Sequence, residues 1–221
     1  MVDKKEALKI LGIAATAGVA AAGAYAYVQY RKAQLDAEAA RLWEVLELKP
    51  GARVGDVGAG VGNMAVRIAG RAGASGRVFA AEINERRLRK LRLRKQKQEL
   101  MNIEIVTAAA DDCNLPAGVC DAVFLRGAYH HLTNPAAMNA SLMRALRPGG
   151  ALAVIDFPPR LLLKPFTPKG IPSDRGGHGI RREMAERELE AAGFEPVRAI
   201  ADWDGDRYCI VVQKPISRLE A

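Results

Sequence analysis

The sequence predicts an α/β domain built as a doubly wound, mostly parallel sheet and preceded by one N-terminal transmembrane helix. Two observations predict the domain. Short apolar runs alternate with helical segments along residues 51–213, and the first of these runs ends in a glycine-rich turn at 58–62. A third observation, an uncharged stretch of 19 residues at 10–28, predicts the membrane helix. The expected organisation is an anchor over 1–32, a linker helix over 33–50 and the folded domain over 51–221.

Composition limits the classes of protein to consider. The chain has 221 residues, enough for one domain and an appendage, and a net charge of +8 with a pI near 9.6. Such a charge favours an anionic partner, which a membrane surface, a nucleic acid or an acidic protein can each provide. Three cysteines without C-x-x-C spacing indicate reduced thiols and argue against a disulfide or cysteine–zinc framework.

The uncharged N-terminal stretch is long enough, as a helix of about 28 Å, to match the hydrocarbon thickness of a bilayer. Three tyrosines cluster at its distal end, where aromatic rings favour the interface. We therefore expect a single-pass anchor in contact with membrane lipid. A cleaved signal peptide, suggested by Ala22-Gly23-Ala24, and a soluble or interfacial helix are the alternatives. Basic residues flank the stretch: Lys4, Lys5, Lys9, Arg31 and Lys32.

The glycine-rich turn predicts a site for a nucleotide-like cofactor. Glycines remove Cβ atoms where a ligand lies close to the backbone, and the helix expected at 64–71 offers unpaired N–H groups. Asn63 stands where the dinucleotide pattern has glycine or alanine, and Asp56 would repel a pyrophosphate but attract a cation. S-adenosylmethionine (SAM) carries an ammonium and a sulfonium and no phosphate. The turn's candidate cofactor-binding residues are Asp56, Gly58, Ala59, Gly60, Gly62 and Asn63.

The second strand, expected at 77–83, ends in Glu82 and Ile83. An acidic residue at this point accepts hydrogen bonds from ribose hydroxyls, although capping of the next helix is an alternative. That helix, at 84–100, is densely basic between residues 86 and 97. We expect its charged face to meet solvent or an anionic lipid surface. Nucleic acid is disfavoured because the helix has no base-stacking aromatic residue.

Further along the chain, residues 109–116 read Ala-Ala-Asp-Asp-Cys-Asn-Leu-Pro, and residues 146–150 read Leu-Arg-Pro-Gly-Gly before an apolar strand. Together with Asp56-x-Gly58-x-Gly60-x-Gly62, these motifs resemble the class I SAM-dependent methyltransferases with a type 11/25-like domain, over about residues 42–214. The resemblance implies a seven-stranded Rossmann-like sheet closed by an antiparallel hairpin at 195–200 and 208–213, with Trp203 and Asp204 in the connecting loop. It also implies that Glu82 binds both ribose hydroxyls, while Asp111 accepts from the adenine amine and the Asp112 backbone N–H reaches the adenine ring.

The strand at 120–125 opens into Arg126 and the run Tyr129-His130-His131. Ligands of open α/β sheets bind at the carboxyl ends of strands where the strand order reverses, so these four residues are expected to face the methyl group, with Arg126 also near the cofactor. Asp156, at the end of the fifth strand, faces the same crevice. The loop at 157–179 is expected to be a lid or a lipid-binding loop, and His178 at its end is a second candidate base. Structural hydrogen bonding is the alternative role for the histidines.

No metal site is expected, because adjacent histidines point in different directions. The predicted function is that of a membrane-anchored SAM-dependent methyltransferase, with its catalytic domain on the cytoplasmic side, where SAM is found. The expected acceptor is a membrane-associated small molecule, such as a lipid or a quinone-like compound. A protein acceptor in a membrane complex and a non-catalytic subunit of such a complex are the alternatives. The three acidic residues Asp56, Glu82 and Asp111 argue against a non-catalytic subunit.

Overall fold

The computed structural model describes residues 4–167, 169–172, 175 and 178–216. The chain divides into two compact units, one ending at Arg41 and the other beginning at Leu42, and each is described by itself.

A single helix, α1 (Lys4–Val45), occupies the N-terminal unit and enters the second one. It runs without a break through the boundary expected between an anchor and a linker. No helix in the described part of the chain combines the length and the apolar character needed to cross a bilayer. The prediction of a transmembrane helix at 10–28 is therefore wrong. The physical reason is composition, because alanine and glycine dominate this stretch and each contributes little apolar surface.

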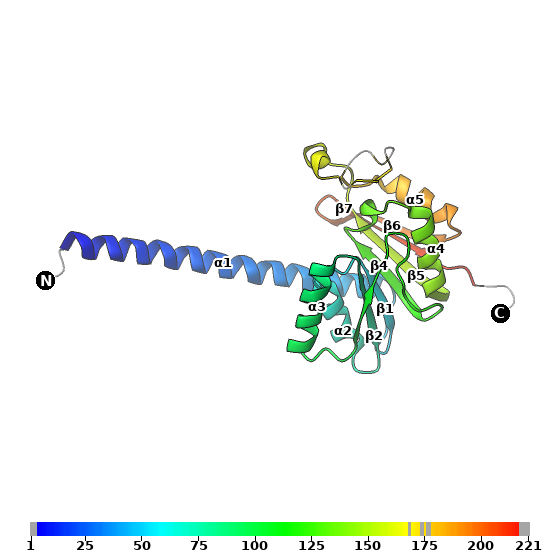
Figure 1. The fold of residues 1–221 in the computed structure, drawn as a ribbon, viewed down its shortest axis with the longest axis horizontal. Coiled ribbons are helices and arrows are strands. Elements are labelled where there is room, and N and C mark those ends of the chain that lie inside the picture. Colours follow the sequence, from blue (N-terminus) through cyan, green and yellow to red (C-terminus); the bar gives the residue numbers. More distant parts are fainter. Residues whose placement is uncertain (1–3, 168, 173–174, 176–177, 217–221) are drawn as a thin grey trace. The chain divides into compact units, whose positions relative to one another are not determined.

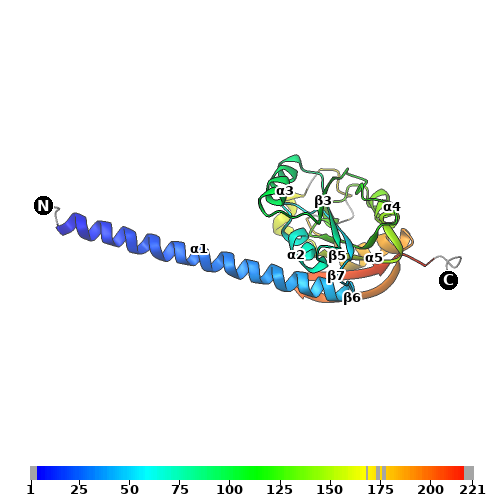
Figure 2. The same ribbon diagram turned by 90° about the horizontal axis from the view of Figure 1, so that it is seen from below.

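The second unit contains a seven-stranded sheet with the order β3-β2-β1-β4-β5-β7-β6 (Figures 1 and 2). Pairing is parallel from β3 to β5, and β7 is antiparallel to both of its neighbours. This confirms the expected mostly parallel, seven-stranded sheet closed by a hairpin. The strands are β1 (Arg53–Val57), β2 (Arg77–Glu82), β3 (Ile103–Thr107), β4 (Cys120–Arg126), β5 (Leu146–Asp156), β6 (Glu195–Asp204) and β7 (Arg207–Gln213).

Two groups of helices cover the sheet. The chain steps from β1 towards β3 and later from β4 in the opposite direction, so right-handed crossovers place the two groups on opposite faces. In the first group, α2 and α3 contact β1, β2 and β3; in the second, α4 and α5 contact each other and β5, β6 and β7 (Figure 1). The helices are α2 (Asn63–Ala72), α3 (Glu85–Lys97), α4 (Pro135–Ala145) and α5 (Arg182–Ala191), with the short 3-10 helices η1 (Tyr129–His131) and η2 (Leu161–Phe166).

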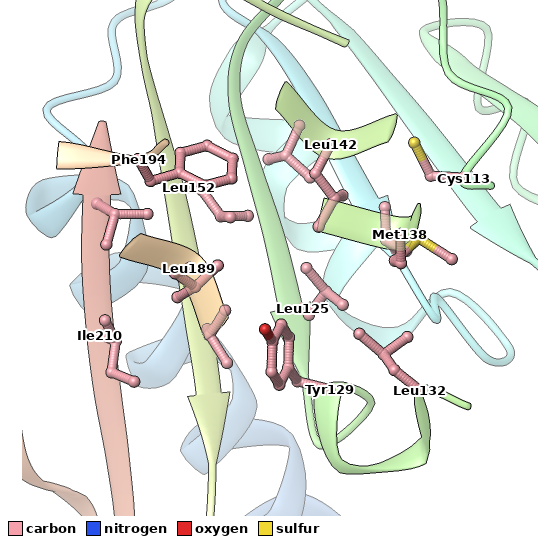
Figure 3. Close-up of a cluster of buried hydrophobic side chains, with 14 of the residues drawn as sticks. Cys113, Leu125, Tyr129, Leu132, Met138, Leu142, Leu152, Leu189, Phe194 and Ile210 are labelled. Atoms are coloured by element: carbon pink, nitrogen blue, oxygen red, sulfur yellow. The ribbon is translucent and has the colours of Figure 1, made fainter. Parts of the chain in front are cut away.

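The main hydrophobic cluster lies between the sheet and the α4–α5 pair (Figure 3). Leu142 from α4 and Leu189 from α5 pack over Leu125 of β4 and Leu152 of β5. Parallel strands covered on both faces need apolar residues at nearly every position, and β4 is buried from Ala122 to Leu125. This packing fixes the carboxyl end of β4, where the candidate catalytic residues begin.

Two strands extend further than the sequence predicted. Residues 146–150, expected to precede the fifth strand, lie within β5, because Leu146 already pairs with Cys120 and an irregularity before Ala122 accommodates the glycines. Trp203 and Asp204, expected in a loop, belong to β6, where Trp203 is buried and Asp204 pairs with Arg207. In both strands the extra residues are held by pairing with a neighbouring strand and by burial in the fold, and neither can be predicted from the local sequence.

Truncation of Leu125 tests the importance of this cluster. Leu125 is 0% exposed, so Leu125→Ala should lower the free energy of unfolding by about 2–5 kcal/mol through lost transfer energy and the cavity left behind. Leu162 is 89% exposed, and Leu162→Ala is the matched control with an expected change below about 0.5 kcal/mol. Urea unfolding measures both. Equal losses for the two variants would contradict the packing described.

Candidate functional site

The candidate site lies at the edge of the sheet where the carboxyl ends of β1, β2, β4 and β5 meet. The strand order reverses between β1 and β4, which is the usual ligand position in such sheets. The glycine turn after β1 and the loop after β4 touch at this point, since a Cβ added to Gly58 would lie 2.6 Å from the Cβ of Ala128. The absence of a side chain at Gly58 therefore lets the cofactor turn and the histidine-bearing loop lie against each other.

The glycine turn is fixed to β2 through its backbone. The N–H groups of Gly58 and Ala59 donate to the carbonyl of Ala81 at 2.9 and 3.0 Å. Gly60 has a φ of 61°, and a Cβ placed on it would meet no atom within 4 Å. The turn therefore presents a side-chain-free backbone surface in front of the N-terminus of α2, where a ligand can approach closely.

Asp56 lies beneath the turn and is only 3% exposed. It accepts a hydrogen bond from the backbone N–H of Ala65, and the positive charge of Arg126 acts on it. Its Oδ2 is buried without a hydrogen-bond partner among the described residues. Burial, partly opposed by the Ala65 hydrogen bond and by Arg126, raises the pKa of Asp56 to about 7. A cationic ligand beside Oδ2 would favour the ionised form.

Glu82, at the end of β2, is 2% exposed and holds three backbone groups together. Its Oε2 accepts from the N–H of Gly60 at 2.8 Å, and its Oε1 accepts from the N–H groups of Ile83 and Asn84 at 3.0 and 2.8 Å. The Arg87 guanidinium lies 3.7 Å away. Glu82 is thus placed at the glycine turn, as expected, and Ile83 beside it leaves 56% of its side chain exposed, an unusual position for an isoleucine.

The two aspartates after β3 differ in their contacts. Asp112 accepts from the N–H of Asn114 at 2.7 Å and from the Arg144 guanidinium at 2.7 Å, so its side chain has structural partners. Asp111 is exposed, which leaves its carboxylate accessible to a ligand. Asn63 opens α2, and its Oδ1 accepts from Arg94 of α3 at 2.8 Å, so its side chain links the turn to the basic helix.

His130 and Asp156 form a buried pair at the ends of β4 and β5. His130 Nδ1 lies 2.8 Å from Asp156 Oδ1, and the His130 N–H donates to Oδ2 at 3.1 Å. The Phe157 N–H also donates to Oδ1, at 2.9 Å. Because a carboxylate only accepts hydrogen bonds, Nδ1 must carry the proton, and Nε2 then carries a lone pair. That Nε2 is buried and has no hydrogen-bond partner among the described residues.

The three predicted histidines lie together. The ring centroids of His130 and His131 are 4.1 Å apart, and His178 lies 4.7 Å from the first and 5.4 Å from the second. The expectation that the adjacent histidines diverge is wrong, because the tight η1 turn brings their rings close. Partial burial, reinforced by the other two histidines, lowers the pKa of His131 to about 4. Burial also lowers the pKa of His178, so both rings are neutral at pH 7.

Tyr129 is not brought together with the histidines. Its side chain lies in the hydrophobic core, and its hydroxyl accepts a hydrogen bond from Asn139 at 2.8 Å (Figure 3). Burial raises the pKa of this phenol well above its usual range, so it does not ionise near neutrality. Arg126 lies half-buried at the end of β4, where its charge acts on Asp56, and its contact with the cofactor stays a prediction.

Sequence reasoning missed two residues around this site. Arg175 is fully buried and donates to the Tyr129 carbonyl at 2.9 Å and to Glu188 at 2.5 Å, which fastens the loop after β5 to the core. Phe157 packs its ring 4.8 Å from that of His130. Arg175 stands in a glycine- and proline-rich stretch, where nothing in the local pattern marks it as buried.

A separate groove of about 520 Å³ lies at the opposite edge of the sheet. It is lined by the turn after α1 and by residues at the amino ends of β4 and β5, including Asp121 and Arg147. Those two side chains pair with each other at 2.8 Å. The groove contains none of the residues expected to bind the cofactor, so we do not assign it to SAM.

The residues at the glycine turn fit SAM. The buried Asp56 Oδ2 suits an ammonium group, Glu82 lies where ribose hydroxyls are expected, and the open surface at Gly60 leaves room for the ligand. Accessible Asp111 and exposed Ile83 add an acceptor and an apolar surface for the adenine. The carboxylates of this set suit a positively charged cofactor, because a cation compensates the charge of a buried carboxylate.

Comparison with known proteins agrees with this geometry. Residues 55–154 match the model of a methyltransferase domain. The ubiquinone/menaquinone biosynthesis C-methyltransferase UbiE of Pseudomonas putida is 32% identical over 123 residues, which are 53% of this chain and 48% of that protein. A UbiE of Bordetella parapertussis is 31% identical over 133 residues, 58% of this chain and 50% of that protein. The chain thus spans about half the length of the curated relatives it matches.

Solved structures show the same fold. A SAM-dependent methyltransferase from Aquifex aeolicus has a TM-score of 0.67 at 23% identity, over 80% of this chain and 89% of that one. The [4+2]-cyclase SpnF has a TM-score of 0.66 at 19% identity, over 82% of each chain. At these identities the likeness concerns the fold alone. Taken with the matched domain and the site geometry, residues 55–154 form a class I SAM-dependent methyltransferase domain, with SAM as its cofactor.

Proposed function

We propose that this chain transfers the methyl group of SAM to a small-molecule acceptor that is quinone-like, in the sense of an electron-rich aromatic ring bearing hydroxyl groups. One observation carries the proposal. The glycine turn touches the loop after β4 at Gly58 and Ala128, so the expected cofactor site and the His130–Asp156 pair share one edge of the sheet. A methyl donor and a base are then neighbours.

In this proposal the cofactor is held by acidic groups and backbone. The Asp56 carboxylate binds the ammonium, Glu82 accepts hydrogen bonds from the ribose hydroxyls, and Asp111 accepts one from the adenine amine. Glu82 has lone pairs left for the ribose, since its three backbone donors do not exhaust two carboxylate oxygens. The same contacts keep the glycine turn in place before the cofactor arrives, which lowers the cost of ordering it.

The chemical step needs positioning and the removal of one proton. When bound, SAM supplies an electrophilic methyl group whose bond to sulfur breaks with the electron pair returning to sulfur. His130 Nε2 accepts the proton of an acceptor hydroxyl, and Asp156 stabilises the imidazolium that forms. The ionised acceptor then provides the electron pair for the new bond to the methyl carbon. His130 and Asp156 are both buried, and their low-dielectric surroundings strengthen the interaction between them.

The acceptor class is inferred from the site and from the relatives. The UbiE proteins are named as C-methyltransferases of ubiquinone and menaquinone biosynthesis, and this name supports a quinone-like acceptor here. Phe157, whose ring lies 4.8 Å from that of His130, adds apolar surface near the expected acceptor position. An anionic surface as a partner of α3, and a cytoplasmic location of the domain, stay predictions from the sequence.

Transfer of a radiolabelled methyl group from SAM tests the function. Purified protein is incubated with labelled SAM and, in separate reactions, with a hydroxylated quinone precursor, total lipid extract or total protein. The proposal expects label in the quinone precursor or in the quinone fraction of the extract. Label in protein alone would replace this acceptor by a protein substrate, and no transfer in any reaction would contradict the proposed activity.

Removal of the Glu82 carboxylate tests the ribose contact. Glu82→Ala should weaken SAM binding by about 1–3 kcal/mol, the usual cost of losing a charged hydrogen-bond partner, when measured by calorimetric titration. Glu85→Ala is the matched control, because Glu85 lies exposed on α3 and should leave the affinity unchanged. Equal affinities for the Glu82 variant and the wild type would show that the ribose lies elsewhere.

The raised pKa of Asp56 predicts a pH dependence of SAM binding. The pKa of Asp56 is about 7 in the folded protein and 3.8 when unperturbed. The protonated side chain therefore contributes to the free energy of unfolding in full below about pH 4, and this contribution is lost as the pH rises through 7. A bound cation favours the ionised form, and SAM affinity should therefore rise by up to about fivefold from pH 6 to pH 7, as the ionised fraction of Asp56 does. Asp56→Asn should flatten this rise and weaken binding at pH 7.5. An unchanged profile in the variant would assign the titration to another group.

A further inference from the structure

All three histidines of the chain belong to one cluster. The sequence contains only His130, His131 and His178, and 46 positions lie between the second and the third. The structure nevertheless brings one potential ligand nitrogen of each to within 4.8 Å of the others. The chain reaches this arrangement by folding the loop after β5 back towards η1, with the Arg160 N–H donating to the His178 carbonyl at 3.0 Å.

Two ring nitrogens of the cluster are buried and have no hydrogen-bond partner among the described residues, namely His130 Nε2 and His178 Nδ1. A buried polar atom without a partner has a free-energy cost, which a ligand at this position would remove. Since Nδ1 of His130 donates to Asp156, its Nε2 carries the lone pair that a metal requires. A carboxylate that orients a histidine in this way is the usual outer partner of a metal-binding imidazole.

We propose that His130, His131 and His178 form a binding site for a divalent transition metal ion, with Zn²⁺ as the best fit. Three imidazoles and one open position are a common ligand set of catalytic zinc, whereas Mg²⁺ and Ca²⁺ prefer oxygen ligands. A tetrahedral zinc places its nitrogen ligands roughly 3.3 Å apart. The rings therefore need to approach by about 1.5 Å or less, which rotation of the exposed His131 and half-buried His178 side chains can provide.

The fourth coordination position of the ion is open and could bind the methyl acceptor, a role that rests on the proposed function. His131 faces solvent, so the fourth position is accessible to an oxygen of the acceptor. A bound divalent ion lowers the pKa of a coordinated hydroxyl and fixes its orientation. In the metal-loaded protein His130 Nε2 is a ligand, and the hydroxyl proton passes to solvent instead of to this nitrogen. The oxygen then provides the electron pair for methyl transfer, and the ion stays bound.

Metal binding is tested without measuring methyl transfer. Tag-free protein, freed of metal with a chelator, is titrated with ZnCl₂ by calorimetry and with Co²⁺ by visible absorption. The proposal expects one ion per chain and the intense bands of tetrahedral Co²⁺. His131→Ala and His178→Ala should each weaken Zn²⁺ binding at least about tenfold, and Asp156→Asn by about 10–100-fold. Glu104→Ala is the control, because Glu104 pairs with Arg77 at the amino end of β2, opposite the strand ends that carry the cluster, and its loss should leave Zn²⁺ binding unchanged.

The competing outcomes are distinct. Absence of Zn²⁺ binding by the wild type, or equal Zn²⁺ affinity in the wild type and both histidine variants, would overturn the site. If a histidine variant does not fold, as judged by circular dichroism, the wild-type Co²⁺ spectrum decides, because the weak bands of octahedral Co²⁺ would also overturn it. The chain's cysteines are all buried, so they do not compete for the ion. Failure of methyl transfer with metal bound would contradict the proposed function but not the metal site.

Discussion

Burial of carboxylates at one edge of the sheet is the interaction on which the site depends. Asp56, Glu82 and Asp156 end or nearly end β1, β2 and β5, and each is almost inaccessible to solvent. A buried charge is costly unless hydrogen bonds compensate it. Glu82 is compensated by three backbone N–H groups, and Asp156 by two backbone N–H groups and the His130 ring. The loops at this edge are therefore shaped around acidic groups, and Asp56 retains one oxygen without a partner.

The doubly wound topology explains why these groups meet. Strands β1, β4 and β5 are adjacent and parallel, so the loops that leave their carboxyl ends all emerge on one side. The core between the sheet and the α4–α5 pair holds β4 and β5 in register, while Arg175 fastens the returning loop that carries His178. The packed core and the loop held by Arg175 therefore place the acidic residues of the expected cofactor site beside the three histidines.

Much of this arrangement was predictable from the sequence. Apolar runs and turn residues predicted the strands of the sheet, with the largest differences at the start of β5 and the end of β6. The glycine turn and Glu82 were predicted at the carboxyl ends of their strands, while the role of Asp111 was implied by the family resemblance. Three features were not predictable. The buried role of Tyr129 depends on its contact with Asn139, and the burial of Arg175 depends on Glu188. The closeness of the histidines depends on the η1 turn and on a distant loop. The absence of charge over residues 10–28 predicted a membrane helix, and this prediction is wrong because the alanines and glycines there make the helix too weakly apolar to cross a bilayer.

The central claim is that buried carboxylates at the glycine turn bind a positively charged nucleoside cofactor beside the histidine cluster. A crystal structure of the protein with S-adenosylhomocysteine tests this most directly. The account predicts the ribose hydroxyls on Glu82, the ammonium on Asp56 and the sulfur directed towards His130. Binding of the ligand in the groove at the opposite edge of the sheet, or a glycine turn closed by the protein's own side chains, would contradict it.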